Sequence, residues 1–136
     1  MKTVAMTNDV FLSHGSRDKG LATLVRKQLS DSGLIVFDAM QGLAGAKISE
    51  LVRDGLIESR TVVLLLTPAS SDNRLLAYEV GKAIAFDKPI FVLHDGLRPK
   101  DIPEFLREFQ LFPLSRLGSV ANQISALKEL PEAISG

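Results

Sequence analysis

The chain has 136 residues, of which 46% are hydrophobic and 24% charged, and this mix predicts one soluble globular domain. Its 16 basic and 16 acidic residues cancel, which argues against nucleic acid or an anionic membrane surface as a partner. The absence of cysteine excludes disulfides, thiolate metal sites and cysteine nucleophiles, and no apolar run approaches the roughly 18 residues of a membrane span, so we expect a cytoplasmic protein.

The first half of the chain predicts two strands and two helices. Residues 10–12 form a short apolar run that indicates the first strand. Ser16 suits the N-cap of the following helix, whose core face recurs at helical spacing: Leu21, Leu24, Val25 and Leu29. Gly33 is expected to end that helix in a left-handed conformation, and residues 34–37 form the second strand. A second amphipathic helix follows, with its core face at Ile48, Leu51, Val52 and Leu56.

The second half predicts three further strands and two helices. Residues 61–66 are β-branched and apolar without alternation, which is typical of a central parallel strand covered on both faces. The third helix is expected to turn one stripe inward: Leu76, Val80, Ala83 and Ile84. Residues 89–93 form the fourth strand, Pro99 and Pro103 mark a loop with a short helical turn, and residues 109–114 form a weak edge strand. The closing helix carries its apolar face at Val120, Ile124, Leu127 and Leu130.

This alternation of strands and helices predicts an α/β fold with a flavodoxin-like, doubly wound, five-stranded parallel sheet. The expected strand order is 2-1-3-4-5, in a single domain that spans residues 9–132 after a short extension of residues 1–8. Ligands of such sheets bind beyond the carboxyl ends of the strands, at the switch point between the first and third strands. The site is therefore expected among the loops 14–19, 38–45 and 67–73.

Glu79 is the one candidate chemical centre on the third helix. With Leu76, Val80 and Ala83 facing the core, its carboxylate lies at the edge of the apolar stripe, partly buried near the first and third strand ends. A surface ion pair with Lys82 at i+3 is the alternative, and from spacing alone it is the commoner role of a helical glutamate. A phosphorelay receiver is excluded, because Leu66-Thr67 stands where the acceptor aspartate is needed.

The loops offer further candidates. Ser13, His14 and Asp18 are too close in sequence to form a hydrolase triad, and the loop after the first strand is either an anion cradle or a plain helix cap. The two histidines, His14 and His94, lack the spacing of metal ligands, so no metal is expected. The glycine-rich loop 38–45 is either a mobile gate and contact loop or an ordinary turn.

Four segments together resemble bacterial Toll/interleukin-receptor (TIR) domains. They are DVFLSHGSRD at 9–18, GLIVFD at 33–38, VVLLLTP at 62–68 and YEVGKA at 78–83, and the resemblance covers about residues 8 to 130. It implies a flavodoxin-like fold and one of two functions. Many bacterial and plant members cleave NAD at the nicotinamide–ribose bond, whereas others only assemble with further TIR domains.

The resemblance also implies roles for individual residues. Glu79 aligns with the catalytic glutamate of the family. The substrate-binding positions would be Ser13, His14, Gly15, Ser16, Arg17, Asp38 and Leu75. Asp38 to Gly45 matches the BB loop, which gates the site and contacts a neighbouring TIR domain through Met40, Gln41, Gly42, Leu43 and Gly45. Leu75 and Ile48 depart from the family, which often has Trp at both positions.

Three hypotheses follow. In the first, the chain is an NAD glycohydrolase or cyclase that forms nicotinamide and ADP-ribose, or a cyclic ADP-ribose isomer, and signals in bacterial antiphage defence. NAD is then the substrate, no cofactor is needed, the active form is a homo-oligomer or filament, and a separate effector reads the nucleotide product. In the second, it is a non-catalytic module for TIR–TIR interaction. The third is an enzyme like the nucleoside deoxyribosyltransferases, which also break N-glycosidic bonds with a glutamate.

Overall fold

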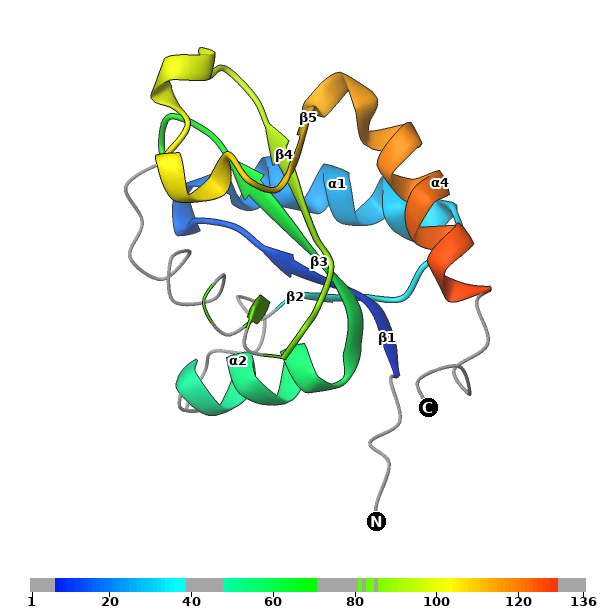
Figure 1. Cartoon of the computed structure of the whole chain (residues 1–136). Helices are drawn as coiled ribbons and strands as arrows, with labels where there is room; N and C mark the ends of the chain where they lie inside the picture. The colour runs from blue at the N-terminus through cyan, green and yellow to red at the C-terminus, as the bar shows by residue number, and fades with distance from the viewer. Residues whose placement is uncertain (1–6, 39–47, 71–80, 82, 85, 130–136) are drawn as a thin grey trace.

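A five-stranded, wholly parallel sheet lies at the centre of the molecule, in the order β2-β1-β3-β4-β5 (Figure 1). The computed structural model describes residues 7–38, 48–70, 81, 83, 84 and 86–129. The strands are β1 (Asn8–Ser13), β2 (Val36–Asp38), β3 (Ser59–Leu66), β4 (Ile90–His94) and β5 (Gln110–Pro113). The predicted strand order is confirmed, and so are the parallel sheet and the single domain.

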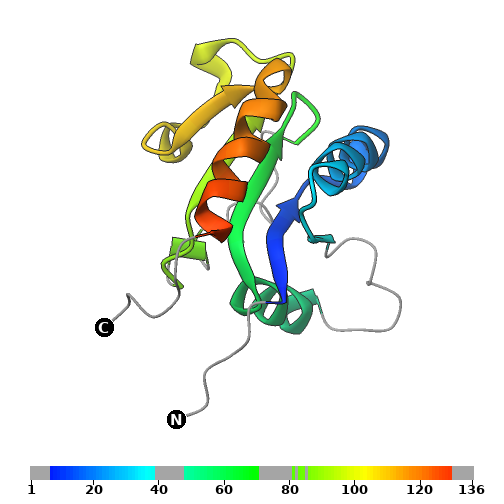
Figure 2. The same cartoon turned by 90° about the vertical axis from the view of Figure 1, so that its right-hand side faces the viewer.

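Helices cover both faces of this sheet. The helices α1 (Lys19–Asp31) and α4 (Leu117–Lys128) lie on one face, and α2 (Ile48–Ile57) lies on the other (Figures 1 and 2). Short 3-10 turns connect the elements: η1 (Ser16–Asp18), η3 (Pro99–Asp101), η4 (Glu104–Leu106) and η5 (Leu114–Arg116). No helix among the described residues has the length and apolar character needed to cross a bilayer.

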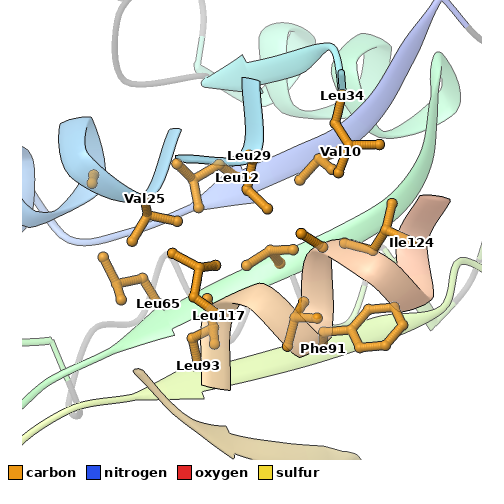
Figure 3. Close-up of a cluster of buried hydrophobic side chains, with 14 residues drawn as sticks. Val10, Leu12, Val25, Leu29, Leu34, Leu65, Phe91, Leu93, Leu117 and Ile124 are labelled. Carbon is orange, nitrogen blue, oxygen red and sulfur yellow. The ribbon is translucent and has the colours of Figure 1, made fainter. Parts of the chain in front are cut away.

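Alternate residues of each strand enter two separate cores. Val10 and Leu12 of β1 face α1 and α4, whereas Phe11 faces α2. Figure 3 shows the first core, in which side chains of β1, β3 and β4 meet those of α1 and α4. On β3, residues 62–66 are all buried, because each face of the strand packs into one of the two cores. Complete burial of each such side chain contributes about 1.5–3 kcal/mol, so this strand supplies much of the stability.

Three local predictions were wrong. Ser16 does not cap a helix, because it is itself the first residue of η1, and Gly15 precedes it without a side-chain cap. Leu24 is 65% exposed, because the core side of α1 is formed by Ala22, Val25 and Leu29 instead. Ile84 is 52% exposed although its neighbour Ala83 is fully buried. Of the other predicted core positions, Leu76, Val80 and Leu130 lie outside the described residues.

At the end of α1 and the start of β2, one prediction is confirmed and one is wrong. Gly33 has φ +87°, which confirms the left-handed turn after the helix. The second strand begins at Val36 rather than at Leu34. Before it, the amide of Ile35 donates to the carboxylate of Asp9 (2.8 Å), while the carbonyl oxygen of Ile35 accepts from the backbone amides of Asp9 and Val10.

Asp9 organises the amino-terminal edge of the sheet. Its side chain is 5% exposed and also accepts a hydrogen bond from Nζ of Lys128 in α4 (3.3 Å), while Nε of Arg60 lies 3.8 Å away. Nearby, burial lowers the pKa of the Lys88 ammonium, and the charge of Arg60 lowers it further. One carboxylate therefore links β1, the chain before β2, and the last described helix.

Gly55 allows α2 to pack closely against the sheet. A Cβ at this position would overlap the ring of Phe37 and touch that of Phe11 at 3.0 Å. These two rings are in tilted contact, with centroids 5.6 Å apart, so a Cβ at position 55 would disturb a packed aromatic pair. A residue without a side chain is therefore required where α2 crosses β1 and β2.

We predict that Gly55→Ala lowers the free energy of unfolding by about 1–2 kcal/mol, because overpacking outweighs the roughly 1 kcal/mol that alanine adds to a helix. Chemical denaturation measures the change. Gly20→Ala is the matched control, since a Cβ on Gly20 of α1 meets nothing within 4 Å, and it should raise stability. Equal effects of the two substitutions would contradict the packing explanation.

Candidate functional site

The carboxyl ends of the first three strands lie next to one another. Leu12 of β1 pairs with Asp38, the last residue of β2, and Ser13 pairs with Leu64 of β3. The chain leaves β1 at Ser13 and continues through His14 and Gly15 into η1. This arrangement brings the start of the 38–45 segment beside the loop that follows β1, on the side of the sheet where ligands of such folds bind.

His14 and Asp38 form a buried polar contact at this edge. Nε2 of His14 lies 3.0 Å from Oδ1 and 2.9 Å from Oδ2 of Asp38, and Nδ1 lies 2.8 Å from the carbonyl oxygen of Gly15. The side chains of the pair are 1% and 6% exposed, respectively. A buried ring thus connects the last residue of β2 to the loop after β1.

A second polar contact connects the loop after β3 to η1. The hydroxyl of Thr67 donates to the carboxylate of Asp18 (2.8 Å), and it accepts a hydrogen bond from the amide of Ala69 (3.2 Å). The amide of Thr67 in turn donates to Oγ of Ser70 (2.9 Å). The loops on the two sides of the switch point are therefore fixed to each other through side chains.

Ser13 provides a buried polar atom at this edge. The residue is 2% exposed, and its hydroxyl makes no hydrogen bond within the part of the chain that the structure describes. Burying an unsatisfied hydroxyl costs about 1–3 kcal/mol, and such atoms often have a functional role. Ser16 and Arg17 follow in η1 and are exposed, so the guanidinium of Arg17 is accessible to an anion.

The structure brings together one part of the predicted site. Ser13, His14, Gly15 and Asp38 are adjacent at the ends of β1 and β2, with Ser16 and Arg17 beside them. The remaining predicted site residues lie outside the described ranges: Met40, Gln41, Gly42, Leu43, Gly45, Leu75 and Glu79. Their roles, and the substrate contacts expected of the first group, stay predictions.

Sequence reasoning did not identify the contact between Asp18 and Thr67. Asp18 and Thr67 fall in the predicted site loops 14–19 and 67–73, but no pairing between them was predicted. A signal was present, because a threonine directly after the most apolar strand lies at the carboxyl edge. Among the described residues no group of three or more His, Cys, Asp or Glu side chains is arranged to hold a metal ion.

Comparison with protein families assigns most of the chain. The family model described as TIR domain matches residues 10–129. The chain belongs to the TIR domain family. The match includes all the described strands except the first two residues of β1, and the resemblance deduced from the four sequence segments is thereby confirmed.

Solved structures show the same fold. Two structures of a metazoan TIR-STING receptor from C. gigas, one of them in complex with 2′,3′-cGAMP, match with TM-scores of 0.74 and 0.73 at 16% and 18% identity. Both comparisons cover 92% of this TIR domain, which spans about two fifths of the receptor chains, 41% and 42%.

Two further structures extend the likeness. The TIR domain of the Toll-related receptor TRR-2 from Hydra magnipapillata matches over 90% of this chain and 98% of its own, with TM-score 0.68 and 19% identity. The TIR domains of the activated Roq1 resistosome, which recognises the pathogen effector XopQ, match over 88% of this chain and 72% of theirs, with TM-score 0.59 and 19% identity. At such identities the structures establish the fold, and a comparison with curated proteins found no match.

We predict that Thr67→Val, which keeps the shape of the side chain but removes its hydroxyl, lowers the free energy of unfolding by about 1–3 kcal/mol. The carboxylate of Asp18 then loses its partner in a partly buried position. Thr23→Val is the control, because the hydroxyl of Thr23 donates to the carbonyl oxygen of Lys19 on the exposed side of α1. Thermal unfolding of both variants measures the difference, and a loss no larger at Thr67 would show that the contact is unimportant.

Proposed function

We propose that this TIR domain breaks the nicotinamide–ribose bond of NAD, with Glu79 as the catalytic carboxylate. The observation that carries the proposal is the family match over residues 10–129. Within that range, the sequence resemblance to NAD-cleaving members aligns Glu79 with their catalytic glutamate. In the sequence, Glu79 follows the loop after β3, and ligands of parallel sheets bind at that edge, between the ends of β1 and β3.

The chemistry requires little beyond one well-placed carboxylate. Nicotinamide leaves as a neutral group, so the departing base needs no proton. The ribose passes through an oxocarbenium-like state, as in glycoside hydrolysis, and a carboxylate near the sugar stabilises its positive charge. Attack by water then gives ADP-ribose and releases one proton, whereas attack by a nucleophile of the same nucleotide gives a cyclic ADP-ribose isomer.

The described residues support this proposal with groups that suit a dinucleotide. The hydroxyl of Ser13 has no partner in the described structure, and the guanidinium of Arg17 is exposed at the same edge, where a pyrophosphate would find a cation. Under this proposal Leu75 contacts the substrate by apolar packing in place of the frequent Trp. The nucleotide product would act on a separate effector in antiphage defence, in the cytoplasm, without a cofactor.

We predict that Glu79→Gln lowers nicotinamide release by at least about 100-fold, because an amide cannot stabilise the developing charge. The assay incubates concentrated protein with NAD and follows nicotinamide, ADP-ribose and cyclic products by mass spectrometry. Glu108→Gln, which neutralises an exposed acid, should retain full activity.

Three results would contradict this assignment. Equal turnover by wild type and Glu79→Gln would remove Glu79 from the mechanism, provided that circular dichroism shows both to be folded. Release of nucleobases from free deoxynucleosides, with no turnover of NAD, would favour the deoxyribosyltransferase hypothesis. If no nicotinamide is released at any protein concentration, the hypothesis that remains is a non-catalytic module for TIR–TIR interaction.

The second candidate function is assembly with other TIR domains. The likeness to the TIR domains of the Roq1 resistosome favours it, and the zero formal net charge leaves little repulsion between copies. Assembly and NAD cleavage are compatible, since an enzyme that is active only as an assembly needs both properties. The predicted contact loop at 38–45 makes them separable by substitution.

We predict that Leu43→Glu weakens self-association at least about 10-fold, because it introduces a charge into the predicted contact loop. Glu79→Gln should leave association unchanged. Sedimentation velocity over a range of protein concentrations measures both. If Leu43→Glu associates as the wild type does, the loop is not the contact surface, and monomeric wild-type protein at all concentrations would contradict assembly of this chain alone.

A further inference from the structure

The contacts of His14 define its protonation. Nδ1 faces the carbonyl oxygen of Gly15 at 2.8 Å, and Nε2 faces both carboxylate oxygens of Asp38 at 2.9–3.0 Å. A carbonyl oxygen only accepts hydrogen bonds, so Nδ1 must carry a proton. A carboxylate also only accepts, so Nε2 must carry one as well. A ring that donates from both nitrogens is an imidazolium.

We propose that His14 and Asp38 form a buried charged pair, with His14 protonated on both nitrogens, which positions the loop after β1 for the reaction. The alternative places the shared proton on the carboxyl group of Asp38, which then donates to a neutral ring. A free imidazole is the stronger base, with a pKa of about 6.5 against about 3.9 for a free aspartate, so the proton belongs on the ring.

Burial makes the pair a positioning device rather than a source of stability. The side chains are 1% and 6% exposed, so both charges have lost most of their hydration. Their attraction in this environment offsets the desolvation cost without a large surplus. Removing His14, however, leaves the carboxylate of Asp38 buried without its counter-charge, and removing Asp38 takes away the group that holds the second proton on the ring. Such a pair therefore specifies one arrangement of the chain and disfavours others.

The contacts run from β2 to the loop after β3. The ring connects Asp38 to the carbonyl oxygen of Gly15, and that oxygen also accepts a hydrogen bond from the amide of Asp18 (3.1 Å). The carboxylate of Asp18 then accepts from the hydroxyl of Thr67. The contact between His14 and Asp38 is thus the first in a series that connects the loops on both sides of the switch point.

This role differs from the one implied by the family resemblance. Both ring nitrogens are engaged by protein atoms, so His14 acts on the substrate through the backbone it orients. The charged pair is a statement about the protein alone, whereas its effect on catalysis rests on the proposed cleavage of NAD. Two separate measurements therefore test the two parts.

The charged pair is tested by ¹⁵N NMR of the histidine rings at pH 8, where a histidine of ordinary pKa is almost entirely neutral. The chain contains only His14 and His94, and the variant His94→Gln identifies the signals of His14. We expect two protonated nitrogens on His14 in the wild type, and a neutral ring in Asp38→Asn. A neutral His14 in the wild type would overturn the proposal without any variant.

The positioning role is tested by a double-mutant cycle in the NAD assay. We expect His14→Gln and Asp38→Asn each to lower kcat by about 10- to 100-fold, with KM changed less than threefold. The kcat of the double variant should be no lower than that of the less active single variant, because both substitutions break the same contact. Asp54→Asn, an exposed residue of α2, should behave as wild type. Additive effects that appear in KM would mean direct substrate contact and contradict the positioning role.

The two parts of the proposal are contradicted by different results. If the wild type releases no nicotinamide, the proposed function is wrong, while the NMR spectra still decide the charge of His14. A doubly protonated ring in an active protein whose kcat is unaffected by both substitutions would support the pair and contradict its part in catalysis.

Discussion

The rest of the structure depends on the adjacent pairing of β1 and β3, both of which are buried on two faces. Five residue pairs join the two strands, and their alternate side chains fill the cores on opposite sides of the sheet. Because the strands are parallel, this one pairing also brings together the loops that follow them. Packing of apolar side chains therefore determines where the polar site is formed.

Polar contacts then refine an arrangement that apolar packing has set. Asp9 lies at the amino-terminal edge and links backbone and side-chain donors from distant elements. His14, Asp38, Asp18 and Thr67 act at the carboxyl edge, where the contacts pass from one loop to the next. The two edges differ in one further respect, since among the described residues the unpartnered hydroxyl of Ser13 lies at the carboxyl edge, next to the exposed Arg17.

The architecture could be predicted from the sequence because strong local patterns determine it. The unbroken apolar run of β3 and the glycine after α1 identified their elements correctly. Predictions failed where one helical step decides the outcome, as at Leu24, whose neighbour Val25 faces the core. The contact of His14 with Asp38 was beyond sequence reasoning, because it depends on the register of two strands 24 residues apart. The position of Glu79 lies outside the described residues.

The contact of Asp9 with Lys128 has a consequence for synthesis on the ribosome. The two residues are 119 positions apart, and α4, which carries Lys128, also covers Val10 and Leu12. A nascent chain that has emerged only as far as β5 thus has β1 and β3 available for pairing, but one face of its sheet lacks the cover that α4 supplies. The sheet is consequently covered on both faces only after α4 has been synthesised. Until then the apolar side chains of the strands are exposed to aggregation, and chaperones have the largest apolar surface to shield.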